Sequence, residues 1–132
     1  MKRKTTRGGM VTVEFALAAP IFILFVFSGI EFSRVNMIRN TISNAVFEGA
    51  RKGILPGATA QDCIDQVQAV LDIIGLVGTT ITINPAVIDP DTETVTVSVA
   101  VPLDSTNGYF TTKFYLGDVL ASSITLKREG RL

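Results

Sequence analysis

The fold is decided by the stretch from Met10 to Ile30, whose sequence is MVTVEFALAAPIFILFVFSGI. It is apolar except for one carboxylate, Glu14, about one turn from its start. A helix that crosses a bilayer needs roughly 20 consecutive, mostly apolar residues. The stretch therefore predicts a transmembrane helix, and a functional interpretation has to explain the charge at Glu14.

The charges of the chain are distributed unevenly around this stretch. Lys2, Arg3, Lys4 and Arg7 give residues 1–9 a charge of +4, whereas the remaining eight basic and twelve acidic residues give the rest −4. A basic flank beside an apolar helix stays in the cytoplasm, which predicts that the C-terminal part lies across the membrane. Four charges without interleaved aromatic residues make a poor nucleic-acid tail, so no nucleic-acid partner is predicted.

A secretory signal peptide is a competing interpretation of the apolar stretch. Such signals place small residues at a cleavage site after the apolar core. Here Ala16, Ala18 and Ala19 precede the most apolar part, Ile21 to Phe27, and no suitable site follows it. We therefore do not expect the whole segment to be removed.

Residue types that support catalysis or metal binding are scarce. The chain has no histidine and one cysteine, Cys63, which excludes an intrachain disulfide, a Cys/His metal site and the commonest general base. Cys63 is expected to be a small core residue, and an intermolecular disulfide is the alternative.

Acidic residues offer two further alternatives. Asp89, Asp91 and Glu93 have a spacing that could bind calcium, but the other acidic positions and the glycine of a recognised loop are missing. The pairs Asp62/Asp65 and Asp89/Asp91 could serve a hydrolase, although a helix start and a turn explain them adequately. We predict no enzymatic activity, metal, cofactor or small-molecule substrate.

The helical part of the chain follows from apolar spacing. Steps of three and four residues after Ile30 predict one continuous helix from about Thr12 to Lys52, which Pro20 should kink or loosen and Gly53 should end. Thr59 is a plausible N-cap for a second helix, from Ala60 to about Ile74.

Beyond the second helix the apolar period changes to two, which is typical of strands. Strands are predicted from Thr80 to Asn84, with a possible resumption at Ala86 to Ile88, from Thr94 to Val101, and from Ser122 to Arg128. The turn-forming residues 89–92 suggest a hairpin between the first two, while residues 109–116 show no clear pattern. The predicted fold class is α+β, with a long N-terminal helix, a second helix and a small antiparallel sheet of about three strands.

A carboxylate inside a bilayer is a functional candidate by default, although Glu14 could also be tolerated at the interface. Its surroundings resemble the processing site of type IV pilin-like proteins: a basic leader ending in Gly9, then Met10, with Glu14 fifth after the glycine and Phe15 next. The chain also resembles the TadE-like family, minor pseudopilins of the tight-adherence (Flp-type) pilus system. That resemblance is carried by Glu31-Phe32-Ser33-Arg34, by Asn44-Ala45-Val46-Phe47-Glu48-Gly49-Ala50-Arg51 and, more generally, by residues 121–129.

The resemblance implies a processing and assembly pathway. A prepilin peptidase would cut between Gly9 and Met10, and Glu14 would pair with the terminal amine of a neighbouring subunit. Family-motif residues would be Glu31, Arg34, Asn44, Glu48, Gly49 and Arg51.

The resemblance also implies an organisation and a location. Residues 1–9 would be a removable leader, 10–30 the transmembrane helix and 31–132 an extracytoplasmic head on a bacterial cytoplasmic membrane. Expected partners are the bilayer, the peptidase, other pilin or pseudopilin subunits and the pilus assembly platform, in the service of surface adhesion. The alternative is an uncleaved single-pass envelope protein whose head binds a protein partner.

Overall fold

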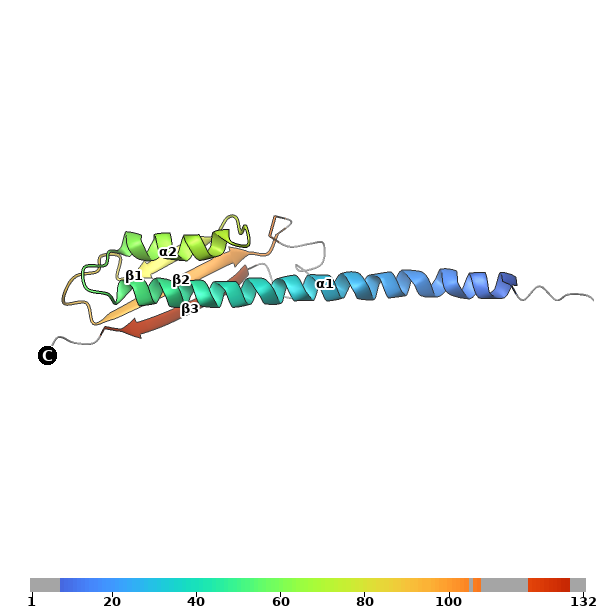
Figure 1. Ribbon diagram of the computed structural model, residues 1–132, viewed down its shortest axis with the longest axis horizontal. Coiled ribbons are helices and arrows are strands. Elements are labelled where there is room, and N and C mark those ends of the chain that lie inside the picture. The colour runs from blue at the N-terminus through green and yellow to red at the C-terminus, as the bar shows by residue number, and fades with distance from the viewer. Residues whose placement is uncertain (1–7, 105, 108–118, 129–132) are drawn as a thin grey trace, which may run out of the picture.

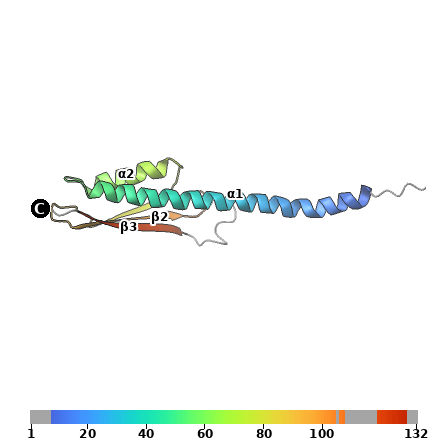
Figure 2. The same cartoon turned by 60° about the horizontal axis from the view of Figure 1, so that its bottom comes forward.

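A computed structural model describes residues 8–104, 106–107 and 119–128 of the chain. It contains two helices, α1 (Gly8–Gly53) and α2 (Ala60–Asp72), and three strands, β1 (Thr80–Asn84), β2 (Thr94–Pro102) and β3 (Val119–Lys127). Figure 1 shows that the distal half of α1 lies beside α2, while its N-terminal half projects away from the other elements. Figure 2 shows both helices on one face of the sheet. The predicted α+β class is confirmed.

Helix α1 is longer at its start than the sequence indicated. It begins at Gly8, four residues before the predicted Thr12, and ends at Gly53. Glycine is a poor helix former, but nothing in the first turn obstructs the backbone, and a Cβ at Gly9 would meet no atom within 4 Å. The helix continues through Pro20.

Helix α2 starts where its capping chemistry predicts. The Thr59 hydroxyl accepts a hydrogen bond from the Asp62 backbone N–H at 3.2 Å, and the Asp62 carboxylate accepts one from the Thr59 N–H at 2.8 Å. This reciprocal capping box satisfies two N–H groups that a helix start leaves unpaired. The Thr59 hydroxyl also donates to the Asp62 carboxylate at 2.7 Å, and this bond, together with the one from the Thr59 N–H, lowers the pKa of Asp62. The helix ends at Asp72 rather than Ile74, and the chain then turns at Gly75, which has a φ of 66°.

The sheet is antiparallel with the order β1-β2-β3. Ile83 pairs with Val97 across β1 and β2, and Val97 pairs with Ile124 across β2 and β3. The predicted hairpin between the first two strands is therefore confirmed. The suggested resumption of the first strand at residues 86–88 is wrong, because Pro85 has no N–H to continue the ladder. Strand β3 begins at Val119, three residues before Ser122, and residues 109–116 lie outside the described part of the chain.

The core lies between the sheet and the two helices. Alternate valines of β2 point into it, because successive strand residues face opposite sides, and α1 packs on β2 and β3 while α2 packs on α1 and β1. Its fully buried members include Ile38, Ile42, Val46, Cys63, Val67, Leu71, Val95, Val97, Val99 and Val101. Burial raises the pKa of the Cys63 thiol, and the position supports its interpretation as a core residue.

Two glycines allow the helices to approach each other closely. A Cβ at Gly49 would lie within 2.4 Å of Val67 Cγ2, and one at Gly53 within 2.8 Å of Cys63 Sγ. Neither distance is compatible with ordinary contact between carbon or sulfur atoms. Gly49 and Gly53 are one turn apart on α1, so together they form the surface against which α2 rests.

The end of the head farthest from the apolar half of α1 is tied together by Arg128. Its guanidinium donates to the carbonyl oxygens of Ile54 at 3.3 Å, Leu55 at 2.8 Å and Asp89 at 2.9 Å. Its backbone N–H donates to the Glu93 carbonyl at 2.7 Å. One side chain at the end of β3 thus joins the α1–α2 loop to the β1–β2 loop.

Candidate membrane and assembly site

The N-terminal half of α1 is apolar and exposed on all sides. Its large side chains, from Met10 at 81% exposed to Ile30 at 51%, contact little else in the described structure. None of the most apolar window of the helix is buried, and its mean hydropathy is 2.3. At 1.5 Å per residue, Met10 to Ile30 is about 31 Å long, which matches the hydrocarbon core of a bilayer. By length and composition, α1 can anchor the protein in a membrane as a single span.

The predicted processing residues lie in the first turn of α1. Gly9 and Met10 are both helical and exposed, and the space around Gly9 is open. The first four N–H groups of a helix have no partner within it, so a turn containing Gly8 and Gly9 unwinds at little cost. Nothing in the folded chain requires glycine at position 9.

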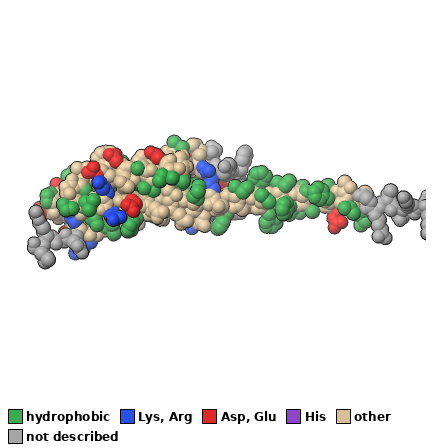
Figure 3. Space-filling view, viewed as in Figure 1, with side chains coloured by type: hydrophobic (Ala, Val, Ile, Leu, Met, Phe, Trp, Pro, Cys, Tyr) green, Lys and Arg blue, Asp and Glu red, His purple; other side chains and the backbone are tan. Residues whose placement is uncertain are grey.

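Glu14 and Phe15 follow one turn later. Both side chains are exposed, Phe15 at 71%, and Glu14 is four residues from Met10, so the two share a helix face. Figure 3 shows an acidic side chain near the end of the otherwise largely hydrophobic N-terminal half of α1. Glu14 is therefore available to a group outside the described part of this chain.

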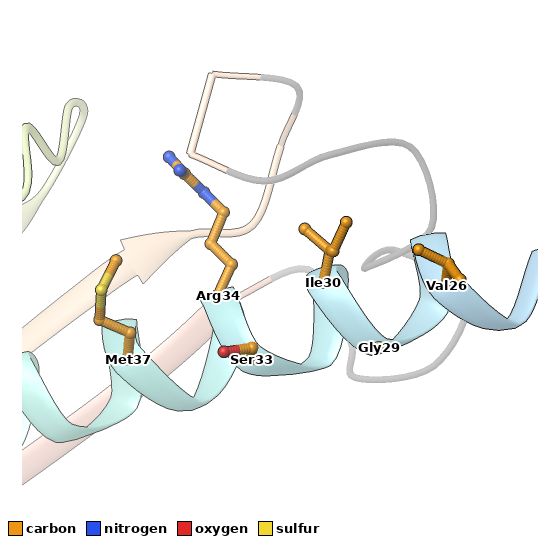
Figure 4. A pocket seen from close by; sticks show the side chains of 6 residues that line it. All are labelled: Val26, Gly29, Ile30, Ser33, Arg34 and Met37. Carbon is orange, nitrogen blue, oxygen red and sulfur yellow. The ribbon is translucent and has the colours of Figure 1, made fainter.

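A polar junction lies where the apolar half of α1 meets the head. Glu31, one turn before Arg34, is only 7% exposed. The Arg34 Nε donates to the Asn107 carbonyl at 3.0 Å. Figure 4 shows the Arg34 side chain projecting from α1 toward the chain that follows β2, away from Ser33.

Asn107 connects this junction to the rest of the head. Its side chain is 1% exposed and donates to the carbonyls of Val77 at 2.6 Å and Pro102 at 3.1 Å, while it accepts from the Val77 N–H at 2.9 Å. Asp104 accepts from the Asn107 N–H at 3.3 Å. Arg34 thereby fixes α1 to a loop that is itself bonded to two other segments.

Replacing Arg34 with alanine is expected to destabilise the head by about 2 kcal/mol, because hydrogen bonds from charged donors are worth about 1.5–3 kcal/mol. The measurement is thermal unfolding of the full-length protein in detergent. Arg39→Ala is the matched control, since Arg39 is exposed on the same helix, and surface substitutions of this kind change stability by about 0.5 kcal/mol or less. Equal losses for the two variants would contradict the role given to Arg34.

A shallow hollow of about 530 Å³ borders the junction. Figure 4 shows its lining residues along one stretch of α1, and all of them except Arg34 are apolar or small. The lining residues are Val26, Gly29, Ile30, Ser33, Arg34 and Met37. The hollow is open and lies at the boundary between the apolar half of α1 and the head.

The other motif residues lie farther along α1 and serve different surfaces. Gly49 faces Val67 in the core, whereas Asn44 is exposed. Glu48 and Arg51 approach to 4.0 Å with side chains that are 41% and 68% exposed. The structure therefore spreads the predicted site residues along one helix of 46 residues instead of gathering them in a cleft.

The structure gives tertiary contacts to residues for which the sequence predicted none. Asn107 and Gly53 each make close contacts with segments distant in the chain. Arg128 was predicted only as the last strand's end, and Asn107 lies in a polar loop without periodicity. The sequence offers one signal for Asn107, which is its position three residues after Asp104, a residue type that is common in turns.

The acidic alternatives have structural explanations. Asp62 caps α2, and Asp65 accepts from Gln61 Nε2 at 2.8 Å. Asp89, Asp91 and Glu93 line a hollow at the tip of the head, together with apolar residues such as Ile88 and Pro90. Within residues 8–104, 106–107 and 119–128, no three acidic or cysteine side chains converge in a way that could hold a metal ion.

The fold and the exposed apolar helix define a class of protein: an α+β head carried on a single membrane-anchoring helix. Residues 9–51, which hold all the predicted site residues, match the family model described as TadE-like protein. The match indicates involvement in the tight-adherence (Flp) pilus system. Comparison with curated proteins and with solved structures gave no match.

Proposed function

We propose that this protein is a membrane-anchored minor pseudopilin that takes part in assembling tight-adherence pili and hence in surface adhesion. Residues 1–9 are its leader, 10–30 its transmembrane helix and 31–132 its extracytoplasmic head, in a bacterial cytoplasmic membrane with the N-terminus inside. A prepilin peptidase cuts between Gly9 and Met10. The protein acts through subunit contacts with other pilins and the assembly platform, and performs no chemistry of its own.

The observation that carries this proposal is one exposed carboxylate, Glu14, in the exposed apolar N-terminal half of α1. Glu14 is exposed, and none of the most apolar stretch of α1 is buried against the rest of the described structure. A carboxylate in such surroundings needs a cationic or hydrogen-bonding partner. Cleavage after Gly9 creates an amine on Met10, and that amine on an adjacent subunit is a partner of the required charge.

The start of α1 supports a second candidate, an uncleaved single-pass envelope protein. The helix begins at Gly8, so the Gly9–Met10 bond is helical, whereas a peptidase needs an accessible, extended peptide. The two glycines make unwinding of this turn easy, which is why we favour cleavage. In the uncleaved form, Glu14 would be an interfacial residue only.

Mass spectrometry of the N-terminus decides between the two candidates. The full-length protein is produced with and without a prepilin peptidase in the same membrane. We expect Met10 as the first residue only when the peptidase is present, and retention of Met1 in its presence would refute processing. Gly9→Val should block the cut, because a branched side chain obstructs the scissile bond, whereas Gly8→Ala leaves that bond unobstructed and should still be cut.

A further inference from the structure

The helical layer of the head carries two matching sets of exposed side chains. On α1 these are Asn44, Phe47 and Arg51, and on α2 they are Asp65, Ala69 and Asp72. Steps of three and four residues place each set on one side of its helix. Phe47 is 45% exposed and the Arg51 side chain 68%, so a large aromatic group and a guanidinium face outward together.

The charges of the two sets are opposite. Helix α2 contains three aspartates and no lysine or arginine. Asp65 and Asp72 accept from the neutral amides of Gln61 and Gln68, which leaves their charge uncompensated within the helix. Figure 3 shows acidic side chains over α2, and both basic and acidic ones over the distal part of α1, where Glu48 lies beside Arg51.

The two sets also lie at matching heights along the molecule. Gly49 is level with Val67 and Gly53 with Cys63, as their close approaches show. Because α1 and α2 run in opposite directions, Arg51 is then level with Asp65. The same antiparallel pairing of positions places Phe47 level with Ala69, and Asn44 level with Asp72.

We propose that the helical layer is the interface of a dimer of this chain, with a two-fold axis parallel to α1. The inference rests on the proposed membrane anchoring, which makes the α1 helices of two copies parallel. A two-fold axis in this direction introduces no shift along α1, and it places α1 of each copy opposite α2 of the other. Each matching pair of heights then becomes a contact between copies, and each contact occurs twice.

The chemistry of the three contacts is complementary. Arg51 of one copy meets Asp65 of the other in a charge-assisted hydrogen bond. Phe47 fills the space above the small Ala69, and the Asn44 amide donates to Asp72. An arrangement that placed α2 against α2 would instead bring aspartates together, which costs free energy.

Each of these contacts is weak by itself. An exposed ion pair is worth about 0–1 kcal/mol, so the charges select the orientation while confinement in a membrane brings the copies together. The proposed partner is therefore a second membrane-anchored copy, held in parallel.

Disulfide trapping tests the geometry. Full-length Phe47→Cys and Ala69→Cys chains, each with a different tag, are placed together in lipid vesicles and exposed to a mild oxidant. We expect the mixed 47–69 product in excess of the 47–47 and 69–69 products, because facing helices lie 8–10 Å apart. Wild-type chain, whose Cys63 is buried, is the control for background. A predominance of either same-variant product, or no mixed product, would overturn the dimer.

A charge exchange tests the energetics by energy transfer between labelled chains in the same vesicles. Arg51→Asp or Asp65→Arg alone should weaken self-association roughly tenfold, since each change affects two pairs per dimer. The double variant should recover it. Asp91→Arg, at an exposed position in the β1–β2 loop at the tip of the head, is the matched control and should leave self-association unchanged. A double variant as weak as the single ones would refute the pairing.

These vesicles contain no peptidase and no pilus component. Failure of the dimer would therefore leave the processing proposal standing, and failure of processing would leave the dimer result intact.

Discussion

Replacing Gly49 with leucine is expected to lower the free energy of unfolding of the head by about 3 kcal/mol. Position 49 leaves no room for even one carbon, because a Cβ would lie within 2.4 Å of Val67 Cγ2 and within 3.5 Å of Val97 Cγ1. Valine cannot move aside easily, since its branched side chain has one strongly preferred rotamer in a helix. The substituted side chain must therefore push α2 away from α1 and open the core.

Chemical or thermal unfolding of the full-length protein in detergent measures this effect. Asn40→Leu is the matched control, because Asn40 is exposed on the same helix and should change stability little. A compensating pair makes the test sharper: Val67→Ala should restore part of the stability lost in Gly49→Ala, since it removes the group that the new Cβ meets. A Gly49→Leu chain as stable as the control would contradict the close approach of the helices.

Replacing Glu14 with glutamine is expected to abolish pilus assembly while membrane insertion continues. The proposed amine partner would be left in a low-dielectric contact without its counter-charge. Breaking a buried pair in this way costs about 3–5 kcal/mol, which corresponds to a factor of roughly one hundred to several thousand in an equilibrium constant. Insertion itself should be unaffected or slightly favoured, because the amide carries no charge.

The measurement compares pili on cells with the amount of protein in the membrane fraction. Glu93→Gln is the matched control, since Glu93 is exposed in the β1–β2 loop of the head. Normal assembly by the Glu14 variant would reduce Glu14 to a tolerated interfacial charge and favour the uncleaved, partner-binding alternative. Loss of the protein from the membrane would point to a failure of insertion.

The elements with a strong local signal were predictable from the sequence. These are the apolar period of α1, the Thr59 cap and the alternating valines of β2. Each is a property of neighbouring residues, so it can be recognised without knowledge of the tertiary structure. The apolar residues after Pro85 suggest that the first strand resumes there. It does not, because Pro85 has no N–H with which to continue the ladder.

The contacts that hold the head together were harder to predict from the sequence. Arg128 and Asn107 bond to backbone carbonyls more than 70 and about 30 residues away, respectively, and such partners have no signature in a local pattern. Gly49 was singled out as a motif residue, but its physical role depends on Val67 in another helix. The roles of Gly9, Met10 and Glu14 remain predictions, because they concern groups outside this chain.

The position of Arg128 has a consequence for the order in which the molecule is built. The α1–α2 loop is synthesised early, yet the side chain that binds its carbonyls is separated from them by 73 and 74 residues. Contacts of such long sequence separation form late, because the intervening chain must first be ordered. The head is therefore complete only after β3 has been synthesised and has paired with β2. Until then the apolar stripe of α1 that includes Ile38 and Ile42 lacks part of the sheet that covers it, so the completion of β3 sets when the head becomes stable.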